Sequence, residues 1–237
     1  MNLNVFIAKS GVCSRRDATV LVKEGRVTVN GKIVREPWHD VEEGSSVKVG
    51  NKLLRAEKHV YIVFNKPKGV TATLEDRFAA AKVTDFIPKK FGRVYPVGRL
   101  DKFSRGLIIL TNDGDLCYAV THPKFEVEKE YLVIVSGEVD RHAIDRIKKG
   151  VKEGDDVLSV KSAVVEYSSP DTTKLKVVVC EGKKRHLRRL FEQLGYTVND
   201  LKRVRVGRLT LGDLKEGEFR VLDKDRIYAC FQDRKKG

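Results

Sequence analysis

The chain has 237 residues, of which 47 are Lys or Arg and 33 are Asp or Glu, so its formal net charge at pH 7 is +14. This length allows one or two domains with a packed core. A hydrophobic fraction of 41% and a charged fraction of 34% exclude wholesale disorder. No apolar run approaches the roughly 18 residues of a membrane helix, so we expect no membrane partner. The charge favours a polyanionic partner, with nucleic acid the first candidate.

The sequence contains no readable signal peptide, and its four cysteines are far apart with no C-x-x-C pair. This cysteine usage is typical of reduced thiols, argues against a disulfide scaffold or a zinc site, and predicts a cytoplasmic protein. Sequence motifs for phosphate loops, dinucleotide binding, zinc peptidases and nucleophile elbows are absent. We therefore expect neither a cofactor nor a metal.

The first fifty residues predict two short helices followed by a hairpin. Apolar residues at helical spacing over 3–7 predict the first helix, and Ser14 with Asp17 predicts the N-cap of the second. Alternating residues over 27–29 and the turn Asn30-Gly31 predict the hairpin. This unit is too small to account for the whole chain.

Basic side chains surround the second helix and the hairpin. Such a run is usually a solvated helix face. However, the residues from Ala8 to Ala18 and from Gly25 to Gly31 resemble, in order, those of the S4-type RNA-binding domain. The resemblance implies RNA contact, for which the candidate residues are Arg15, Arg16, Lys23 and Arg26.

From Tyr61 the sequence becomes rich in strands. Continuous apolar runs at 61–64 and 107–110 are typical of buried strands in a covered sheet. Few helices interrupt the strands and no βαβ unit repeats, which predicts an α+β fold. Further strands are expected at Tyr131–Val135 and Leu175–Cys180, and helices at Asp115–Pro123 and His186–Leu194.

An acidic residue lies in the loop that leads into the second of these buried strands. Asp101 follows Gly98-Arg99-Leu100 and precedes Ser104. Such a loop can hold a side chain rigidly at the rim of a cleft. Taken alone, however, Asp101 is an ordinary turn residue.

The context of Asp101 resembles the signature of bacterial ribosomal pseudouridine synthases of the RsuA type. The match extends over nearly the whole chain and includes the N-terminal module. One departure is Lys184-Arg185-His186, where relatives usually have Asn-Arg-Gln; this leaves Arg188 in register but the role of His186 unassigned. The segments that carry the resemblance are 98–101, Ser104, 106–107, 110–114, 65–69, 128–131 and 181–189.

The resemblance implies a cofactor-free enzyme that isomerises uridine in ribosomal RNA to pseudouridine. It implies a small S4-type helix-helix-hairpin domain over residues 1–50, a linker over 51–58, and a catalytic domain over 59–237. The implied catalytic domain has a mixed, mainly antiparallel sheet with a central RNA-binding cleft. By the same resemblance, Asp101 matches the catalytic aspartate, Tyr131 the active-site tyrosine, and Arg188 the basic residue that pairs with the aspartate.

The reaction itself explains why a single carboxylate suffices. The N1–C1′ bond breaks, the base turns while it is held, and C5 bonds to C1′, so no water is activated, unlike in glycoside hydrolysis. Asp101 acts either as a nucleophile at C1′ or as a base at C2′, and the sequence leaves both open. Tyr131 offers a ring for the flipped base and a hydroxyl for removal of the C5 proton, unless it is a core aromatic.

Binding energy is expected from phosphate contacts. The segment 183–208 holds nine basic residues and two acids. Arg189 is expected to face away from the apolar side of its helix, and residues 202–206 alternate as a strand that is expected to place three basic side chains on one face. The candidate RNA-binding residues here and in the neighbouring loops are Arg99, Lys129, Lys183, Lys184, Arg185, Arg189, Lys202, Arg203 and Arg205.

Two other functions remain open at this point. A non-catalytic RNA-binding factor in ribosome assembly would keep the same scaffold, although it has no need for a lone acid among cations. A nucleic-acid glycosidase is disfavoured because no motif supplies a second acid. For the enzyme, the carboxy-terminal run favours 23S over 16S RNA, the substrate is expected to be a stem-loop or a pre-ribosomal particle, and a monomer is expected.

Overall fold

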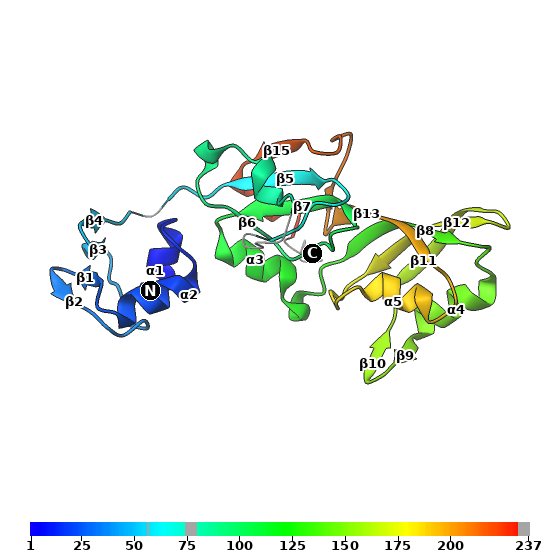
Figure 1. Ribbon diagram of the computed structural model, residues 1–237, viewed down its shortest axis with the longest axis horizontal. Helices are drawn as coiled ribbons and strands as arrows, with labels where there is room; N and C mark the ends of the chain where they lie inside the picture. Colours follow the sequence, from blue (N-terminus) through cyan, green and yellow to red (C-terminus); the bar gives the residue numbers. More distant parts are fainter. Residues whose placement is uncertain (56, 74–79, 232–237) are drawn as a thin grey trace, which may run out of the picture. The chain divides into compact units, whose positions relative to one another are not determined.

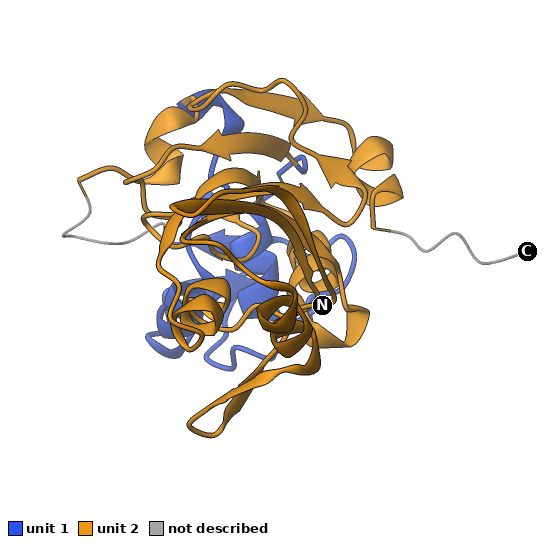
Figure 2. Ribbon diagram, turned by 90° about the vertical axis from the view of Figure 1, so that its right-hand side faces the viewer, with its two compact units in different colours: residues 1–59, 89–94 blue, residues 60–88, 95–237 orange. Residues whose placement is uncertain are grey.

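The computed structural model (Figure 1) describes residues 1–55, 57–73 and 80–231. The chain divides into unit 1, residues 1–59 and 89–94, and unit 2, residues 60–88 and 95–237, which Figure 2 colours separately. Residue 56 of the expected linker and residues 74–79 and 232–237 of the expected catalytic domain lie outside the described residues. None of the described helices is long and apolar enough to cross a membrane.

Unit 1 has the two helices and the hairpin that the sequence predicts. The second helix begins with a capping box, in which Ser14 Oγ accepts from the Asp17 amide at 3.1 Å and the Asp17 carboxylate accepts from the Ser14 amide at 3.2 Å. Asn30 and Gly31 both have positive φ, as a two-residue hairpin turn requires. Its elements are α1 (Leu3–Lys9), α2 (Arg15–Lys23), β1 (Val27–Val29), β2 (Lys32–Ile33), β3 (Val47–Val49), β4 (Lys52–Leu53) and the 3₁₀ helix η2 (Lys89–Phe91).

The core of unit 1 lies between its helices and its sheet. Leu3 and Ile7 of α1 are buried against Ala18 and Val22 of α2 and against Val27 of β1. The sheet has the strand order β2-β1-β3-β4. Helices this short are not stable on helix propensity alone, so the packing of these apolar side chains stabilises them.

Unit 2 contains a larger sheet with helices interspersed along the chain. Its strands are β5 (Tyr61–Lys66), β6 (Tyr95–Pro96), β7 (Arg105–Thr111), β8 (Lys129–Ser136), β9 (Val151–Glu153), β10 (Asp156–Leu158), β11 (Ser162–Ser168), β12 (Thr172–Val179), β13 (Val198–Val206), β14 (Leu209–Thr210) and β15 (Phe219–Leu222). Its helices are η1 (Val83–Phe86), α3 (Gly114–Thr121), η3 (Pro123–Phe125), α4 (Arg141–Lys149), α5 (His186–Glu192) and α6 (Lys224–Ala229).

The sheet of unit 2 is mixed and mainly antiparallel. Its order is β11-β12-β8-β13-β7-β5-β15, with β14 paired to β13 and β6 paired to β7. Strands β13 and β7 run parallel, whereas the other pairs are antiparallel. The prediction of an α+β fold is confirmed.

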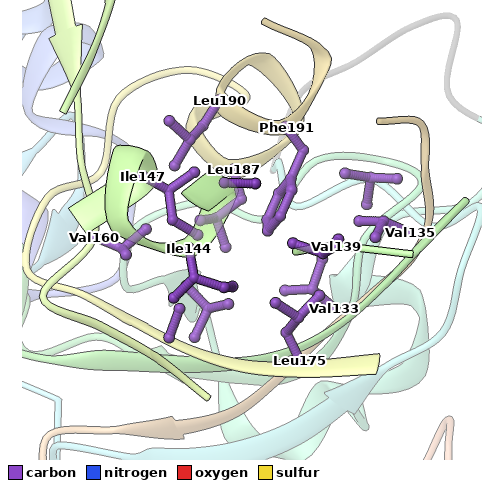
Figure 3. Close-up of a cluster of buried hydrophobic side chains, with 14 of the residues drawn as sticks. Val133, Val135, Val139, Ile144, Ile147, Val160, Leu175, Leu187, Leu190 and Phe191 are labelled. Atoms are coloured by element: carbon purple, nitrogen blue, oxygen red, sulfur yellow. The ribbon is translucent and has the colours of Figure 1, made fainter. Parts of the chain in front are cut away.

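One half of the sheet is covered by α4 and α5 (Figure 3). Val133 of β8 and Leu175 of β12 are fully buried against Ile147 of α4 and against Leu190 and Phe191 of α5. The apolar spacing along α5 predicted this inward face. Burying these aliphatic and aromatic groups is the main stabilising contribution on this side.

The other half of the sheet is covered by α3 and α6. Val63 of β5 and Ile109 of β7 pack with Leu116 and Val120 of α3 and with Ile227 of α6. The two helical layers leave between them a cleft over the middle of the sheet, where β13 joins β7 to β8.

Candidate active site

The cleft has a volume of about 1060 Å³ and lies entirely within unit 2. The strands β7, β13, β8 and β12 contribute its floor, and α3 and α5 contribute side chains on either side. The loop from Val97 to Ser104 and the segment 181–185 complete the lining. A cavity of this size can enclose a nucleoside with its flanking phosphates.

Asp101 lies in the loop between β6 and β7 and lines the cleft. Leu100 before it and Ser104 after it are buried, and the Ser104 amide donates to the Asp101 carbonyl at 3.0 Å. The half-buried Asp101 carboxylate makes no hydrogen bond or ion pair with any residue that the structure describes. The loop is therefore anchored on both sides of a carboxylate that is open to the cleft.

Lys66 stabilises this loop through a hydrogen bond to the backbone next to Asp101. The Lys66 side chain is 0% exposed, and its Nζ donates to the carbonyls of Pro67 at 2.9 Å, Val70 at 2.7 Å and Lys102 at 3.3 Å. Burial lowers the pKa of Lys66 to about 8, a shift that the charge of Asp101 opposes. In the sequence, Lys66 is noted only as part of the 65–69 segment that carries the family resemblance. Its structural role could not be inferred there, because its partners are backbone atoms.

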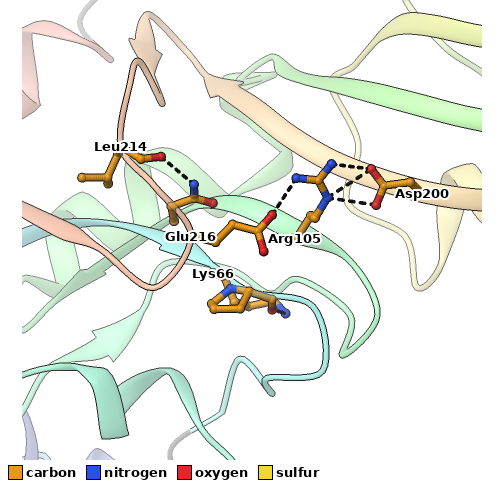
Figure 4. Close-up of polar contacts among 7 residues, drawn as sticks. Lys66, Arg105, Asp200, Leu214 and Glu216 are labelled. Atoms are coloured by element: carbon orange, nitrogen blue, oxygen red, sulfur yellow. Dashed lines mark hydrogen bonds and ion pairs between the residues drawn. The ribbon is translucent and has the colours of Figure 1, made fainter.

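Arg105 fixes the other end of the loop (Figure 4). Its Nε and Nη2 donate to the Asp200 carboxylate at 3.0 and 2.7 Å, and its Nη1 donates to Glu216 Oε1 at 2.6 Å. These partners tie the start of β7 to β13 and to the segment before β15. Bidentate pairing of this kind is geometrically specific as well as attractive.

The floor of the cleft carries Lys129, Tyr131 and Arg203. Tyr131 of β8 pairs in register with Arg203 of β13, so both side chains project from the same face of the sheet. Lys129 is two residues before Tyr131 and shares this face. The Tyr131 hydroxyl has no hydrogen-bond partner among the described residues.

The two cations of the floor are held by backbone carbonyls. Arg203 is 4% exposed and its Nε donates to the Leu107 carbonyl at 2.7 Å. Lys129 Nζ donates to the carbonyls of Val127 at 3.0 Å and Cys180 at 3.4 Å. Burial, followed by the charge of Arg203, lowers the pKa of Lys129.

A glycine makes the close approach of β7 and β13 possible. Gly106 pairs with Arg203 in the parallel register and has φ +104. A Cβ atom at this position would lie 2.2 Å from the Arg203 carbonyl oxygen. The glycine in the sequence motif is therefore required by the backbone contact that joins the two halves of the cleft floor.

Arg188 of α5 reaches the loop that carries Asp101. Its Nη2 donates to the Phe103 carbonyl at 3.2 Å and its Nη1 to the Val198 carbonyl at 2.9 Å. Burial and the neighbouring Arg185 lower the pKa of Arg188, and the charge of Asp101 opposes this shift. Within the described part of the chain, Arg188 and Asp101 interact through their charges without forming an ion pair.

The expectation that residues 202–206 place three basic side chains on one face was wrong. Lys202 and Arg203 are adjacent on β13 and project to opposite faces, and the register shifts between Arg203 and Arg205. Arg203 is buried in the cleft floor, whereas Arg205 forms ion pairs with Glu128 and Glu130, both at 3.1 Å.

Arg189 and Lys183 are also engaged by acids. Arg189 Nη2 forms an ion pair with Glu153 and donates to Asp156 at 2.8 Å, which fastens the β9–β10 hairpin to α5. Lys183 Nζ lies 3.4 Å from Asp156 and 3.3 Å from Glu181. Acids outside the segment thus offset part of the positive charge counted over 183–208.

Several predicted RNA-binding side chains are exposed. In unit 2 these are Arg99, Lys184 and Arg185, with Lys202 half-buried. In unit 1 the exposed residues are Arg15, Arg16 and Lys23 of α2 and Arg26 in the turn after it. Contact of these residues with RNA stays a prediction.

His186, whose role the sequence left unassigned, is buried at the start of α5. Its Nε2 lies 2.8 Å from the Ser159 carbonyl, and burial lowers its pKa. The imidazole thus ties α5 to the segment after β10. Among the described residues, no group of three or more His, Cys, Asp or Glu side chains could hold a metal ion.

Comparisons with known proteins identify the family of this chain. Residues 60–193 match the family model for RNA pseudouridylate synthase, and residues 1–47 match the S4 domain. Ribosomal large subunit pseudouridine synthase B of Bacillus subtilis (strain 168) is 35% identical over 227 residues, which cover 95% of this chain and 93% of that protein. The dual-specificity RNA pseudouridine synthase RluF of Escherichia coli (strain K12) is 35% identical over 236 residues, which cover 98% of this chain and 79% of that protein.

The fold is similar to that of a crystal structure of a pseudouridylate synthase. The TM-score is 0.68 at 26% sequence identity, and the alignment covers 97% of this chain and 99% of that chain. Sequence and fold therefore agree over both units. The chain belongs to the RNA pseudouridylate synthases, the isomerases that convert uridine in RNA to pseudouridine, and it carries an S4 domain ahead of the catalytic domain.

Proposed function

We propose that this enzyme isomerises a specific uridine of ribosomal RNA, and that the Asp101 carboxylate acts on the ribose of that uridine in the cleft. The observation that carries the proposal is a carboxylate with no partner among the described residues, set on a doubly anchored loop at a cleft whose floor offers an aromatic ring. A residue whose backbone is held in place and whose side chain is not engaged is available to bind substrate.

The chemistry requires no atom from outside the substrate other than protons. The N1–C1′ bond breaks, the base turns in the cleft, and the C5–C1′ bond forms. The proton on C5 leaves and N1 gains one, so the product is an isomer of the substrate. Asp101 either bonds transiently to C1′ or takes the proton from C2′ and returns it.

Tyr131 is proposed to support the turning base and to assist the loss of the C5 proton. Its position on the cleft floor and its unengaged hydroxyl, among the described residues, support this role. Tyr131→Phe keeps the ring, so RNA binding is expected to persist while the final proton transfer slows. Unchanged catalysis in this variant would reduce Tyr131 to a packing residue.

The target uridine is proposed to enter the cleft as a flipped nucleotide. A base inside a helix cannot be reached, and its extrusion costs about a few kcal/mol, least in a loop. The exposed side chains of Arg99, Lys184 and Arg185 at the cleft are suited to the flanking phosphates. The S4 domain is proposed to supply further phosphate contacts.

Arg188 is proposed to hold the Asp101 loop and to stabilise the carboxylate electrostatically. A lysine cannot donate in a planar fork to the carbonyls of Phe103 and Val198. Arg188→Lys is therefore expected to keep RNA binding and to lose most of its single-turnover rate. A near-normal single-turnover rate would contradict this role.

The 23S RNA of the large subunit is the favoured substrate over 16S RNA. The Bacillus subtilis relative is named for the large ribosomal subunit, and the match covers almost all of both chains. Mapping pseudouridines in ribosomal RNA from a deletion strain tests this assignment. Loss of a 16S position instead of a 23S position would overturn it.

The decisive experiment compares Asp101→Asn with the wild type in a tritium-release assay on RNA labelled at C5 of uridine. The substitution is nearly isosteric, so RNA binding is expected to persist while turnover falls by more than about 100-fold. Binding of ribosomal RNA without tritium release by the wild type would favour the alternative function, a non-catalytic ribosome-assembly factor.

A further inference from the structure

A cluster of aromatic side chains around a lysine lies at the end of α3 and in η3. It comprises Tyr118, His122, Lys124 and Phe125, here called the aromatic rim. Tyr118 is 48% exposed and Phe125 is 46% exposed, although large aromatic side chains are usually more buried. None of these residues has a role in the proposed chemistry.

The local backbone holds the aromatic rim in place. His122 caps η3 by accepting from the Lys124 amide at 3.3 Å, and Pro123 occupies the first turn. Glu126 has φ +45 and ends the helix. The ring centroids of Tyr118 and Phe125 lie 5.7 Å apart in an edge-to-face arrangement at 90°.

The cation is placed between the two exposed rings. Lys124 Nζ lies 5.0 Å from the centroid of Tyr118 and 4.7 Å from that of Phe125. The rings thus fix a positive charge beside two partly open aromatic faces. This charge disfavours association with the same patch on a second copy of the chain.

The aromatic rim adjoins the cleft. His122 and Pro123 line the cleft together with Thr121. A Cβ atom on Gly98, three residues before Asp101, would lie 3.5 Å from Thr121 Cγ2. The aromatic rim therefore lies at one edge of the cleft, beside the loop that carries Asp101.

We propose that the aromatic rim binds an unpaired nucleotide adjacent to the target uridine, with its base stacked on Tyr118 and its phosphate near Lys124. Flipping the target removes a stacking partner from its neighbour, and an exposed ring replaces that partner. Stacking on aromatic side chains is tolerant of base identity and stabilises single strands. This inference rests on the proposed function.

The test is a binding cycle with Tyr118→Ala and RNA stem-loops in which the nucleotide on one side of the target lacks its base. One RNA is abasic on the 5′ side of the target and another on the 3′ side. The wild type is expected to bind one of these two about 5- to 150-fold more weakly than the intact RNA. Tyr118→Ala is expected to lose a similar factor on intact RNA and little more on the abasic RNA. Tyr118→Trp is expected to restore binding.

Tyr167→Ala is the matched control, because Tyr167 is 57% exposed on β11 and does not line the cleft. It is expected to bind these RNAs as the wild type does. An equal abasic penalty in the wild type and in Tyr118→Ala would overturn the inference, as would wild-type affinity in Tyr118→Ala. Tritium release by the wild type is measured in parallel, so that failure of the proposed function is seen separately from failure of stacking.

Discussion

Tyr131 of β8 and Arg203 of β13 are register partners on antiparallel strands and project from the same face into the floor of the cleft. Arg203 in turn pairs with Gly106 of β7 across the parallel contact. A single residue of β13 thus links the strand that follows the Asp101 loop to the strand that carries Tyr131.

Arg203→Met is expected to destabilise the fold rather than to weaken phosphate binding. The Leu107 carbonyl loses a buried donor, which costs about 1–3 kcal/mol. Lys184→Met is the matched control, since Lys184 is exposed in the same basic segment. Urea unfolding and RNA affinity against salt measure the two effects.

The salt dependence separates the two variants. Lys184→Met is expected to reduce the slope of log K against log[salt] by about one and to keep wild-type stability. Arg203→Met is expected to keep the slope. A reduced slope in Arg203→Met at wild-type stability would contradict the burial of this side chain.

Gly106→Ala is expected to lose more than about 4 kcal/mol of unfolding free energy, because backbone atoms obstruct the added methyl group. Gly137→Ala is the control: Gly137 has φ +76, but a Cβ there meets no atom within 4 Å. It is expected to lose about 1 kcal/mol from backbone strain alone. Similar thermal unfolding of both variants would refute the close contact of β7 and β13.

Arg189→Gln is expected to loosen the β9–β10 hairpin, because its ion pairs with Glu153 and Asp156 are lost. Amide exchange over residues 151–158 should therefore increase by about a few-fold. RNA affinity should fall less than in Lys184→Gln. The reverse ranking, with unchanged exchange, would restore Arg189 as a phosphate contact.

Lys66 makes stability depend on pH in a definite direction. Its pKa of about 8 lies below the value of 10.5 for an unperturbed lysine, so folding disfavours the charged form. Between these values the unfolded chain binds more protons, and the free energy of unfolding rises by up to ~1.4 kcal/mol per pH unit. Below about pH 8 Lys66 is protonated in both the folded and the unfolded chain, so it no longer makes the free energy of unfolding depend on pH.

The measurement compares urea unfolding of the wild type, Lys66→Met and Lys148→Met at several pH values from 7 to 9.5. The difference between the wild type and Lys66→Met should grow in favour of the wild type above pH 8. Lys148 is exposed, so its variant should follow the wild type. Parallel profiles for all three proteins would contradict the effect of burial on Lys66.

Local signals in the sequence predicted local structure well. The Ser14 cap, the Asn30-Gly31 turn and the apolar spacing of α5 each involve residues within a few positions of one another. The helix α4 was missed although Asp140 caps it and Gly150 follows it, signals that were available in the sequence.

The site was predictable only as far as its residues share a motif. The resemblance led to Asp101, Tyr131 and Arg188, and the fold brings Asp101 and Tyr131 to one cleft. The role of Lys66 could not be predicted because its partners are carbonyls, whereas strand alternation alone places Lys202 and Arg203 on opposite faces, so three basic side chains on one face should not have been expected. The acids that engage Arg189 lie more than thirty residues earlier.

The place of β13 in the sheet determines how much of the chain must be synthesised before the sheet can assemble. The strand spans Val198–Val206, yet it stands between β7 and β8, which are made much earlier. A nascent chain that ends before β13 contains Asp101 and Tyr131 but has no strand to unite their two halves. The chain must therefore be synthesised through β13 before the two halves of the sheet can join and form the cleft floor.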